Sequence, residues 1–441
     1  MTLDETTLKQ AFDILHAANA SVAHQWPGDS SNRQPLHTVY GGAQLFKAGT
    51  TGKLGELALA SMDRYAPDAA TLAAALDLPG DAAMHQLVWE RVRAKLQREP
   101  VEDFRIDFED GFGVRPDPEE DHHAVRAATE VARGMKAGVL PPFIGIRIKP
   151  LNDELGRRSV RTLDLFITTL IEQGGRLPDN FVITLPKIPH KMHVAALVTL
   201  LQALEAKLGL EDGALKIELM VELPQTIFDA KGRVVLPDLI EYARGRCVGA
   251  HFGTYDYTAA TNITAAWQVM DHPACDFAKS VMQVSLSGTG VFLSDGATNV
   301  MPVGPHSGEL TAAQEAENAA VVHRAWKMAY DHTLHSLKGG FYQGWDLHPA
   351  QLVTRYAACF SFFLDGLDAA TERLSNFVAK AAQATLVGDV FDDAATGQGL
   401  LNYFLRAWNS GAINFDQVAA TGLTEEELRG RSFVKILEGR K

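Results

Sequence analysis

The sequence predicts an α/β protein: a (β/α)8 TIM barrel with an N-terminal helix, a helical insertion after the first strand and a helical C-terminal extension. Two observations predict this fold. Eight short apolar or β-branched runs alternate with longer segments of helical periodicity, which implies parallel strands joined by right-handed crossovers. Seven of these runs end in polar residues that are unusual in strands, as expected where barrel strands open onto one pocket.

Each predicted strand is a short run rich in Val, Ile, Leu and Phe. The stretch of about 60 residues between the first two strands reads as mostly helical, and it includes the Ala-rich run 69–75. The eight strands are expected near residues 36–40, 104–108, 143–148, 181–185, 217–222, 248–253, 291–294 and 344–347.

The segments between the strands carry helix signals. Leucines recur at steps of three and four across 190–209, and Gly209 supplies a stop. Thr311 and Gln314 have the spacing of a capping box at the start of a long helix that ends at Gly339. Helices in these positions are what a repeated βα unit requires.

The chain is expected to divide into three parts. After about residue 352 strand signals fade, and the remainder reads as helices broken by an acidic, Gly-containing loop from Gly388 to Gly399. A last helix is predicted from Thr424 and Glu427, again spaced as a capping box. The predicted parts are an N-terminal helix and loop (1–34), a TIM-barrel catalytic domain (35–352) and a helical C-terminal extension (353–441).

Composition excludes several classes of function. The 441 residues include 41 Lys and Arg against 54 Asp and Glu, a formal net charge of −13. This balance argues against generic binding to nucleic acid or to an anionic membrane, because both need a basic surface. Three dispersed cysteines, no signal-peptide pattern at the start and no long apolar run lead us to expect a cytoplasmic protein that acts on a small molecule.

Polar residues at the strand ends form a candidate site. In a parallel barrel the βα loops converge at the C-terminal ends of the strands, and catalytic residues lie there. The side chains expected to converge are Glu109 and Asp110 after the second strand, then Arg147, Lys187, Glu222, Asp256, Asp295 and His348 after the third to eighth.

Carboxylates gathered in one pocket repel one another unless a cation neutralises them. A set of oxygen ligands favours Mg²⁺, with Mn²⁺ as the alternative, over zinc. We expect Glu222 and Asp256 to bind the metal, with Glu109 and Asp110 holding its waters or the substrate. Arg147 would hold a substrate carboxylate. The structural alternative is that these acids are ion-pair partners of the neighbouring cations.

Six short motifs follow one another at the strand ends: Asp107-x-Glu109-Asp110, Arg147-Ile148-Lys149-Pro150, Leu185-Pro186-Lys187-Ile188, Val221-Glu222-Leu223-Pro224, Phe252-Gly253-Thr254-Tyr255-Asp256-Tyr257 and Leu347-His348-Pro349-Ala350-Gln351. Their order resembles that of the HpcH/HpaI aldolase and citrate lyase β-subunit family, as a divergent branch. The resemblance covers roughly residues 35–352, and malate synthases are more distant relatives.

The resemblance implies a phosphoenolpyruvate/pyruvate-type TIM barrel with a divalent metal held by Glu222 and Asp256. It implies that Arg147 contacts the substrate carboxylate or carbonyl, and that the reaction makes or breaks a carbon–carbon bond through an enolate. It also implies a homo-oligomer in which the C-terminal helices cap a neighbouring subunit's pocket. The long insertion and Gly111 after Asp110 depart from the short citrate lyase β pattern.

Several roles stay open at this stage. Lys187 could bind substrate or form a Schiff base, although the metal pair makes the latter redundant and a salt bridge is the simpler interpretation. The general base is His348, His37 or a metal-bound hydroxide. His251 is a further candidate, although a core histidine is the simpler interpretation. The role of Asp295 is undecided.

The function predicted from these residues is a divalent-metal-dependent carbon–carbon lyase. It would act through a metal-stabilised enolate on a 2-oxo acid or a hydroxyacyl thioester. One alternative is an acyl-CoA condensing enzyme or thioesterase with malate synthase-like chemistry on the same barrel. A second alternative is a non-catalytic binding subunit.

Overall fold

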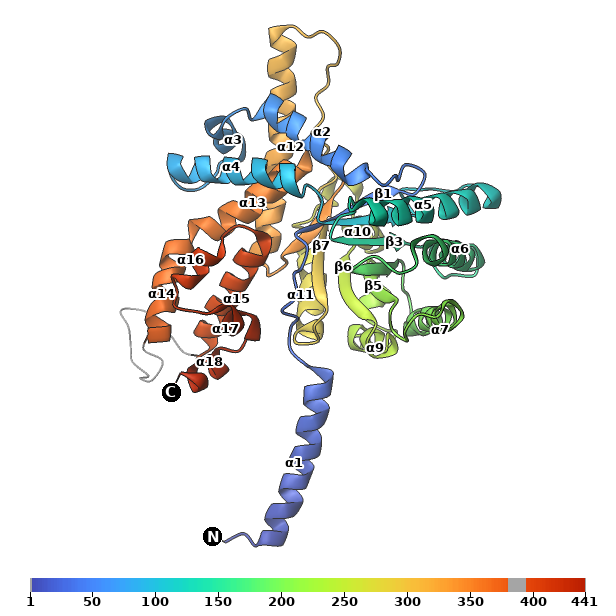
Figure 1. The fold of residues 1–441 in the computed structure, drawn as a ribbon, viewed down its shortest axis with the longest axis vertical. Helices are drawn as coiled ribbons and strands as arrows, with labels where there is room; N and C mark the ends of the chain where they lie inside the picture. Colours follow the sequence, from blue (N-terminus) through green and yellow to red (C-terminus); the bar gives the residue numbers. More distant parts are fainter. Residues whose placement is uncertain (1, 380–393, 441) are drawn as a thin grey trace.

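A computed structural model describes residues 2–379 and 394–440. Eight parallel strands follow one another in sequence order, and β1 pairs with both β2 and β8 to close the barrel (Figure 1). The predicted TIM-barrel fold is therefore confirmed. The strands are β1 (His37–Gly42), β2 (Asp103–Asp107), β3 (Phe143–Arg147), β4 (Phe181–Leu185), β5 (Lys216–Val221), β6 (Cys247–Phe252), β7 (Phe292–Ala297) and β8 (Gln343–Asp346).

Alternation along each strand separates an outer apolar layer from a polar barrel interior. In β2, Phe104 and Ile106 are buried among the apolar residues of the core. The residue between them, Arg105, reaches across the barrel to Glu218 of β5, with 2.6 Å between Nη2 and Oε2. The main apolar core thus lies between the sheet and the surrounding helices, while charged side chains fill part of the barrel itself.

Helices surround the sheet as the repeated βα pattern predicts (Figure 1). The capping box of Thr311 and Gln314 starts α12, and Gly209 ends α7 in a left-handed conformation, so both predicted helices are confirmed. The helices that follow strands β2 to β8 are α5 (Asp117–Ala137), α6 (Gly156–Gly174), α7 (Lys191–Leu208), α8 (Pro224–Ile227), α9 (Leu236–Tyr242), α10 (Thr254–Ala260), α11 (Pro273–Leu286), α12 (Ala312–Lys338) and α13 (Gln351–Asp365), with a 3-10 turn at Ala265–Trp267.

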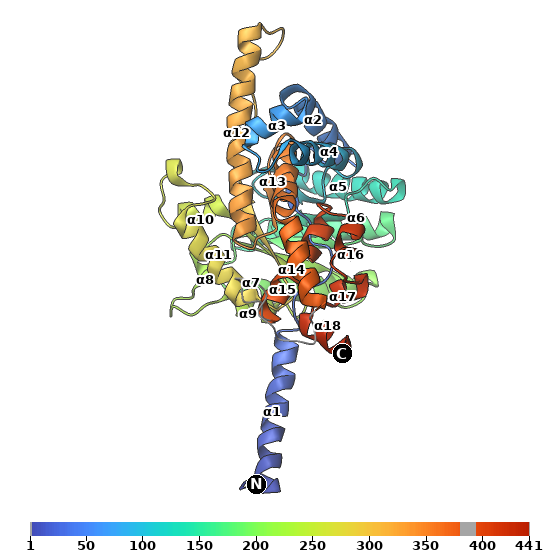
Figure 2. The same cartoon turned by 90° about the vertical axis from the view of Figure 1, so that its left-hand side faces the viewer.

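Additional helices lie outside the regular barrel. The insertion after β1 is helical as predicted, and α12 extends beyond the barrel on the side where the insertion lies (Figures 1 and 2). The N-terminal helix α1 (Glu5–Gln25) projects from the opposite side, and none of its residues is buried. The insertion comprises α2 (Thr50–Tyr65), α3 (Ala69–Leu76) and α4 (Ala82–Arg98).

The C-terminal part is helical and packs beside the barrel (Figure 2). Helix α13 begins at Gln351 and so spans the predicted boundary at residue 352. The capping box of Thr424 and Glu427 starts α17, as predicted. The remaining helices are α14 (Leu367–Ala379), α15 (Ala394–Ser410), α16 (Phe415–Ala419), α17 (Glu425–Gly430) and α18 (Phe433–Gly439).

The predicted acidic loop from Gly388 to Gly399 needs a correction. Residues 394–399 belong to α15, while 388–393 lie outside the described residues. Gly397 suggested a loop, but it is a packing glycine: a Cβ there would lie 2.6 Å from the ring of Phe433. Close approach of helix α15 to α18 requires that glycine. Within the described residues, no helix combines the length and apolar content needed to cross a bilayer.

Candidate active site

The ends of β2 and β3 join Asp107 and Arg147 in a buried two-pronged ion pair. Arg147 donates from Nε to Asp107 Oδ1 at 2.7 Å and from Nη2 to Oδ2 at 2.5 Å. Asp107 also accepts from the backbone N–H groups of Glu109 and Gly111. Burial acts against ionisation, but the Arg147 guanidinium outweighs it and holds the pKa of Asp107 below its usual value. Arg147 is thus pre-oriented by the protein's own acid.

The remaining edge of Arg147 faces the pocket. Its Nη1 atom lies 3.0 Å from Glu109 Oε2 and 3.5 Å from Asp110 Oδ2, and its guanidinium lies over the ring of Tyr40, 4.9 Å from the centroid. Gly111 allows this arrangement, because a Cβ there would lie 2.7 Å from Asp107 Oδ2. The departure from the citrate lyase β pattern at Gly111 therefore has a local packing reason.

Lys187 is the meeting point of the predicted acids. Its Nζ atom lies 2.8 Å from Glu109 Oε1, 3.1 Å from Asp256 Oδ2 and 3.9 Å from Glu222 Oε1. Its backbone N–H donates to Glu222 Oε1 at 2.7 Å. Burial works against the charge, but Glu222 and Glu109 outweigh it and raise the pKa of Lys187. A lysine kept protonated is a salt-bridge partner and a poor Schiff-base nucleophile.

The backbone of Lys187 is in the left-handed region, with φ 49°. This conformation is uncommon for a residue with a side chain, and it persists only where the surroundings enforce it. Here it directs the backbone N–H at Glu222 and brings the ammonium group into the acid cluster. The strained backbone of Lys187 therefore helps to hold Glu222 and the ammonium group in place.

Glu222 and Asp256 approach the same point from neighbouring elements. Glu222 follows β5 and is 1% exposed, while Asp256 lies in the first turn of α10 with a side chain 40% exposed. Gly253 makes the approach feasible, because a Cβ there would lie 2.5 Å from that of Glu222. Burial, together with the neighbouring Glu109 and Asp256 carboxylates, raises the pKa of Glu222 to about 8.

The chemistry of this donor set suits a hard cation. Buried Glu222 Oε2 accepts no hydrogen bond in the part of the chain that the structure describes. Five carboxyl groups share the mouth with the cations Lys187 and Arg147, so negative charge is in excess; the acids are Asp107, Glu109, Asp110, Glu222 and Asp256. No group of three or more His, Cys, Asp or Glu side chains among the described residues is arranged to hold a metal. Glu222 and Asp256 are the two carboxylates here that could hold a cation, with the remaining oxygens coming from water or substrate.

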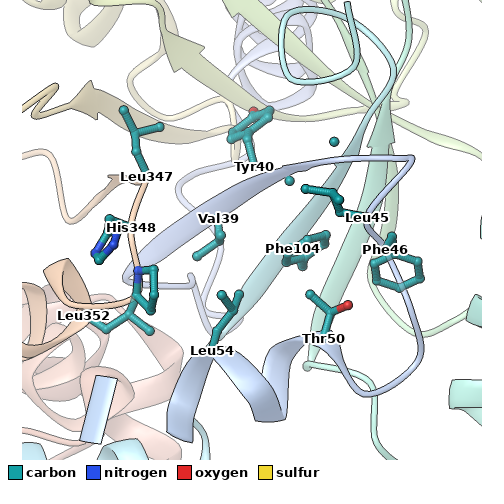
Figure 3. A pocket seen from close by; sticks show the side chains of 13 residues that line it. Val39, Tyr40, Leu45, Phe46, Thr50, Leu54, Phe104, Leu347, His348 and Leu352 are labelled. Carbon is teal, nitrogen blue, oxygen red and sulfur yellow. The ribbon is translucent and has the colours of Figure 1, made fainter. Parts of the chain in front are cut away.

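His348 lines a cavity of about 200 Å³ between β1, α2 and the loop after β8 (Figure 3). Its Nδ1 accepts from the Ala350 N–H, and burial lowers the pKa of the imidazole. Figure 3 shows Val39 and Tyr40 of β1 near Leu347 and His348. Tyr40 connects this cavity to the acid cluster, because its ring also contacts Arg147. The lining is mainly apolar: Val39, Tyr40, Gly41, Gly42, Leu45, Phe46, Thr50, Leu54, Phe104, Leu347, His348, Pro349 and Leu352.

A family model described as a domain of unknown function, DUF6986, matches residues 15–436. The chain belongs to the DUF6986 family. No curated protein matches the sequence. Among solved structures, a citrate lyase from Burkholderia xenovorans LB400 is 20% identical with a TM-score of 0.51, over 78% of this chain and 94% of that one. That likeness establishes the shared fold.

A malate synthase from Haloferax volcanii is 14% identical with a TM-score of 0.46, over 92% of this chain and 99% of that one. This weaker likeness supports no inference about the DUF6986 chain.

His37 does not lie with the other predicted site residues of this DUF6986 protein. It begins β1, so it lies at the opposite end of the barrel from the strand ends that carry the acids. Its Nδ1 lies 2.9 Å from Asp346 Oδ2, and its Nε2 accepts from the Glu102 N–H at 3.1 Å. His37 is 0% exposed, and these two contacts link the start of β1 to β8 and to the residue before β2. The prediction that it serves as a base at the mouth is not supported by this geometry.

Asp295 and His251 also have structural partners. Asp295 Oδ2 lies 2.9 Å from Lys279 Nζ of α11 and accepts from Ser336 of α12, so it faces the helices rather than the pocket. His251 is inside the barrel, with Nε2 2.9 Å from Glu218 Oε2. The simpler interpretation of His251 as a core histidine agrees with this placement.

A polar network inside the barrel was not predicted from the strand ends. Arg105 bridges Asp103 and Glu218, and Glu218 also accepts from Thr184 at 2.7 Å. Tyr40 lies above this network, with its hydroxyl 3.3 Å from Glu218 Oε1. The signal was present: charged residues at alternate positions of apolar strands, such as 103, 105 and 107, predict a polar inward face.

Proposed function

We propose that this chain is a divalent-metal-dependent carbon–carbon lyase whose substrate is a small 2-oxo acid or a hydroxyacyl thioester. The observation that carries the proposal is the buried Glu222 carboxylate. One of its oxygens lacks any donor among the described residues, and it lies beside Asp256 in a mouth with excess negative charge. A buried carboxylate oxygen without a hydrogen-bond donor is costly unless the group is protonated or binds a cation.

Glu222 and Asp256 would hold the metal, with Mg²⁺ favoured and Mn²⁺ as the alternative. When bound, the metal would supply Lewis-acid polarisation of a carbonyl next to the bond that breaks. Lys187 contacts both carboxylates, so it balances their charge and can turn towards a substrate oxygen. Glu109 and Asp110, on the other side of Lys187, would order water or substrate hydroxyls.

Arg147 would orient the substrate. Asp107 occupies two of its nitrogens and fixes the plane of the guanidinium. Nη1 is left to face the pocket, where a substrate carboxylate or enolate oxygen would replace Glu109 as its partner. Positive charge held where negative charge develops is usually the largest catalytic contribution. His348 is the candidate for proton transfer, because it lines the neighbouring cavity.

The proposal is tested by ligand-dependent melting followed by product analysis. Mg²⁺ with oxalate or pyruvate should raise the melting temperature, since a ligand that binds only the folded state stabilises it. The Glu222→Gln variant should lose this rise. Release of pyruvate or glyoxylate from 4-hydroxy-2-oxo acids, without free thiol, would identify the lyase.

Two controls make the test specific. Asp179→Asn removes an exposed carboxylate far from the mouth and should leave the metal response unchanged. Incubation with acetyl-CoA and glyoxylate should release no thiol; thiol release would instead identify a condensing enzyme or thioesterase. An unchanged metal response in Glu222→Gln would contradict the assignment of the metal ligands, and no response to metal and 2-oxo acid would favour a binding subunit.

A further inference from the structure

A second cavity lies at the other end of the barrel, where the C-terminal helices meet it. It measures about 240 Å³ and adjoins Phe292, the first residue of β7, and Tyr342, which precedes β8. Helix α15 contributes Asn402 and Arg406 to its wall, and Arg431 follows α17. Because these positions precede the strands, the cavity is distinct from the candidate active site at the C-terminal ends.

Arg406 is the unusual residue in this cavity. Its Nη1 donates to Gln34 Oε1, and its guanidinium lies over the ring of Tyr342 at 4.8 Å from the centroid. No carboxylate pairs with it in the described part of the chain. Burial lowers the pKa of Arg406, and the nearby charge of Arg431 adds to this shift. The group nevertheless stays a cation at neutral pH, because an arginine does not deprotonate in proteins.

Arg406 is partly buried, and the most buried arginines of the described chain have a different kind of partner. Each of the four arginines with 5% exposure or less pairs with a carboxylate at 2.5–3.1 Å. Such pairing is expected, because an unpaired charge in a low-dielectric interior lowers the stability of the folded protein. The four are Arg105, Arg147, Arg246 and Arg355.

Arg431 brings a second guanidinium into the same cavity. Its Nη2 lies 3.1 Å from Asp29 Oδ2, and its Nη1 donates to the Ser30 carbonyl. Asp29 is half exposed, so its compensation of Arg431 is screened by water. Asn402 also lines the cavity and accepts from Gln398 through its carbonyl oxygen, which leaves its amide nitrogen to donate. Two guanidinium groups therefore share this cavity with a single carboxylate, that of Asp29.

We propose that this cavity binds a small oxyanion, a phosphate or carboxylate group, between Arg406 and Arg431. Planar guanidinium forks match the geometry of such groups, and Asn402 supplies a further donor. The bound anion would fasten the C-terminal helices to the barrel, because Gln34, the partner of Arg406, also donates to the Leu293 carbonyl and to Gln343 of β8. The site lies outside the candidate active site and does not depend on the proposed function.

Melting in phosphate-free buffer tests the proposal, with inorganic phosphate, sulfate and malonate as separate probes. At about 100 times the dissociation constant, an anion that binds only the folded chain should raise the melting temperature by about 3 °C, and the rise should saturate. Phosphate and sulfate acting alone would identify a phosphate-type site, and malonate acting alone would identify a carboxylate site. No saturable rise with any of the three would overturn the proposal.

Substitutions test whether the anion-dependent rise in melting temperature comes from this cavity. Arg406→Gln should abolish the saturable rise, and Arg406→Lys, which keeps the charge but loses the fork, should weaken anion affinity by about tenfold. Arg176→Gln is the matched control, because it removes an exposed arginine elsewhere and should respond like the unchanged chain. If Arg406→Gln does not fold, Arg431→Gln provides the same test with a weakened response. Lys187→Met, which removes a cation from the barrel mouth, should keep the full rise; its loss in this variant would place the anion at the active site and overturn the proposal.

Discussion

Two glutamates four residues apart, Glu218 in β5 and Glu222 directly after it, have pKa values shifted in opposite directions. Glu218, inside the barrel, accepts from Thr184 and Arg105 and lies 2.9 Å from His251 Nε2. Burial works against its charge, but Arg105 and His251 outweigh burial and lower the pKa of Glu218. Glu222, at the mouth, has one oxygen that meets no donor among residues 2–379 and 394–440, and burial raises its pKa to about 8.

Glu218 therefore has a structural role, whereas the Glu222 carboxyl group is available to bind a ligand. Inside the barrel, each carboxylate oxygen of Asp103 and Glu218 accepts a hydrogen bond. Thr38 and Arg105 donate to Asp103, and Thr184 and Arg105 donate to Glu218. The mouth leaves negative charge uncompensated around Lys187. Buried polar groups are normally satisfied, so those that are not deserve a functional explanation. Substitutions in the two regions should therefore have different consequences.

The largest expected effect is on stability in the barrel interior. Arg105→Met leaves Asp103 and Glu218 without their shared cation, so it should lower the free energy of unfolding by about 4 kcal/mol. Urea denaturation measures the loss. At the mouth, Lys187→Met should cost about 1 kcal/mol, because this lysine is partly exposed and its partners reach water. Equal losses for the two variants would contradict the distinction between the regions.

The next prediction is that Glu222 and Glu218 make the stability of the protein depend on pH in opposite directions. The folded-state pKa of Glu222 lies above its unfolded value, so its contribution to stability is complete below about pH 4.5 and is lost as the pH rises through about 8. In the presence of EDTA, Glu222→Gln should therefore gain melting temperature relative to the unchanged chain between these values. Melting curves at pH 5, 7 and 9 measure the difference.

Glu218→Gln provides the contrast. The pKa of Glu218 is lowered in the folded state, so its contribution is present above the unfolded pKa and is lost only as the pH falls below it. This variant should be less stable than the unchanged chain at pH 7 and should approach it in acid. A parallel pH response of the two variants would show that the environments are alike.

A smaller effect concerns metal affinity. Because Glu222 must lose its proton to bind a cation, Mg²⁺ affinity should rise about tenfold per pH unit from pH 6 towards 8 and then level off. Isothermal titration calorimetry at a series of pH values measures it. Affinity that stays constant across this range would exclude Glu222 as a ligand that titrates with a raised pKa.

The smallest effect isolates the backbone of Lys187. Its φ of 49° favours glycine, so Lys187→Gly should be more stable than Lys187→Ala by about 1 kcal/mol, although both variants lack the ammonium group. Urea denaturation of the pair compares them without any difference in charge. Equal stability would mean that the left-handed conformation relaxes when the side chain is lost.

The strands were predictable because buried parallel strands leave a strong local signal. Each predicted run overlaps an observed strand, and the acids at 109, 222 and 256 were correctly expected to converge. Convergence follows from topology alone, since equivalent ends of parallel strands meet at one face. The metal, the substrate and the general base remain predictions.

The sequence did not predict which way some side chains face, because neighbouring residues alone do not fix the ends and the register of a strand. His37 is adjacent to a strand, but it stands where that strand begins. Asp295 ends a run like its neighbours, yet it faces Lys279 and Ser336 in the helical layer. A shift of one residue along a strand turns a side chain from the pocket to the opposite face. An error of one residue in a predicted strand can therefore assign a structural side chain to the site.

The sequence by itself determined the alternation of strands and helices, and with it the closed barrel and the face on which its strand-end acids gather. Periodicity and topology are properties of the chain's order, so they can be read without coordinates. Only the tertiary structure decided which charges are neutralised. Arg105 pairs with Glu218, whereas among the described residues one Glu222 oxygen meets no donor and Arg406 forms no ion pair. Neutralisation depends on distances of a few ångströms between residues far apart in the chain, and on how much water each retains.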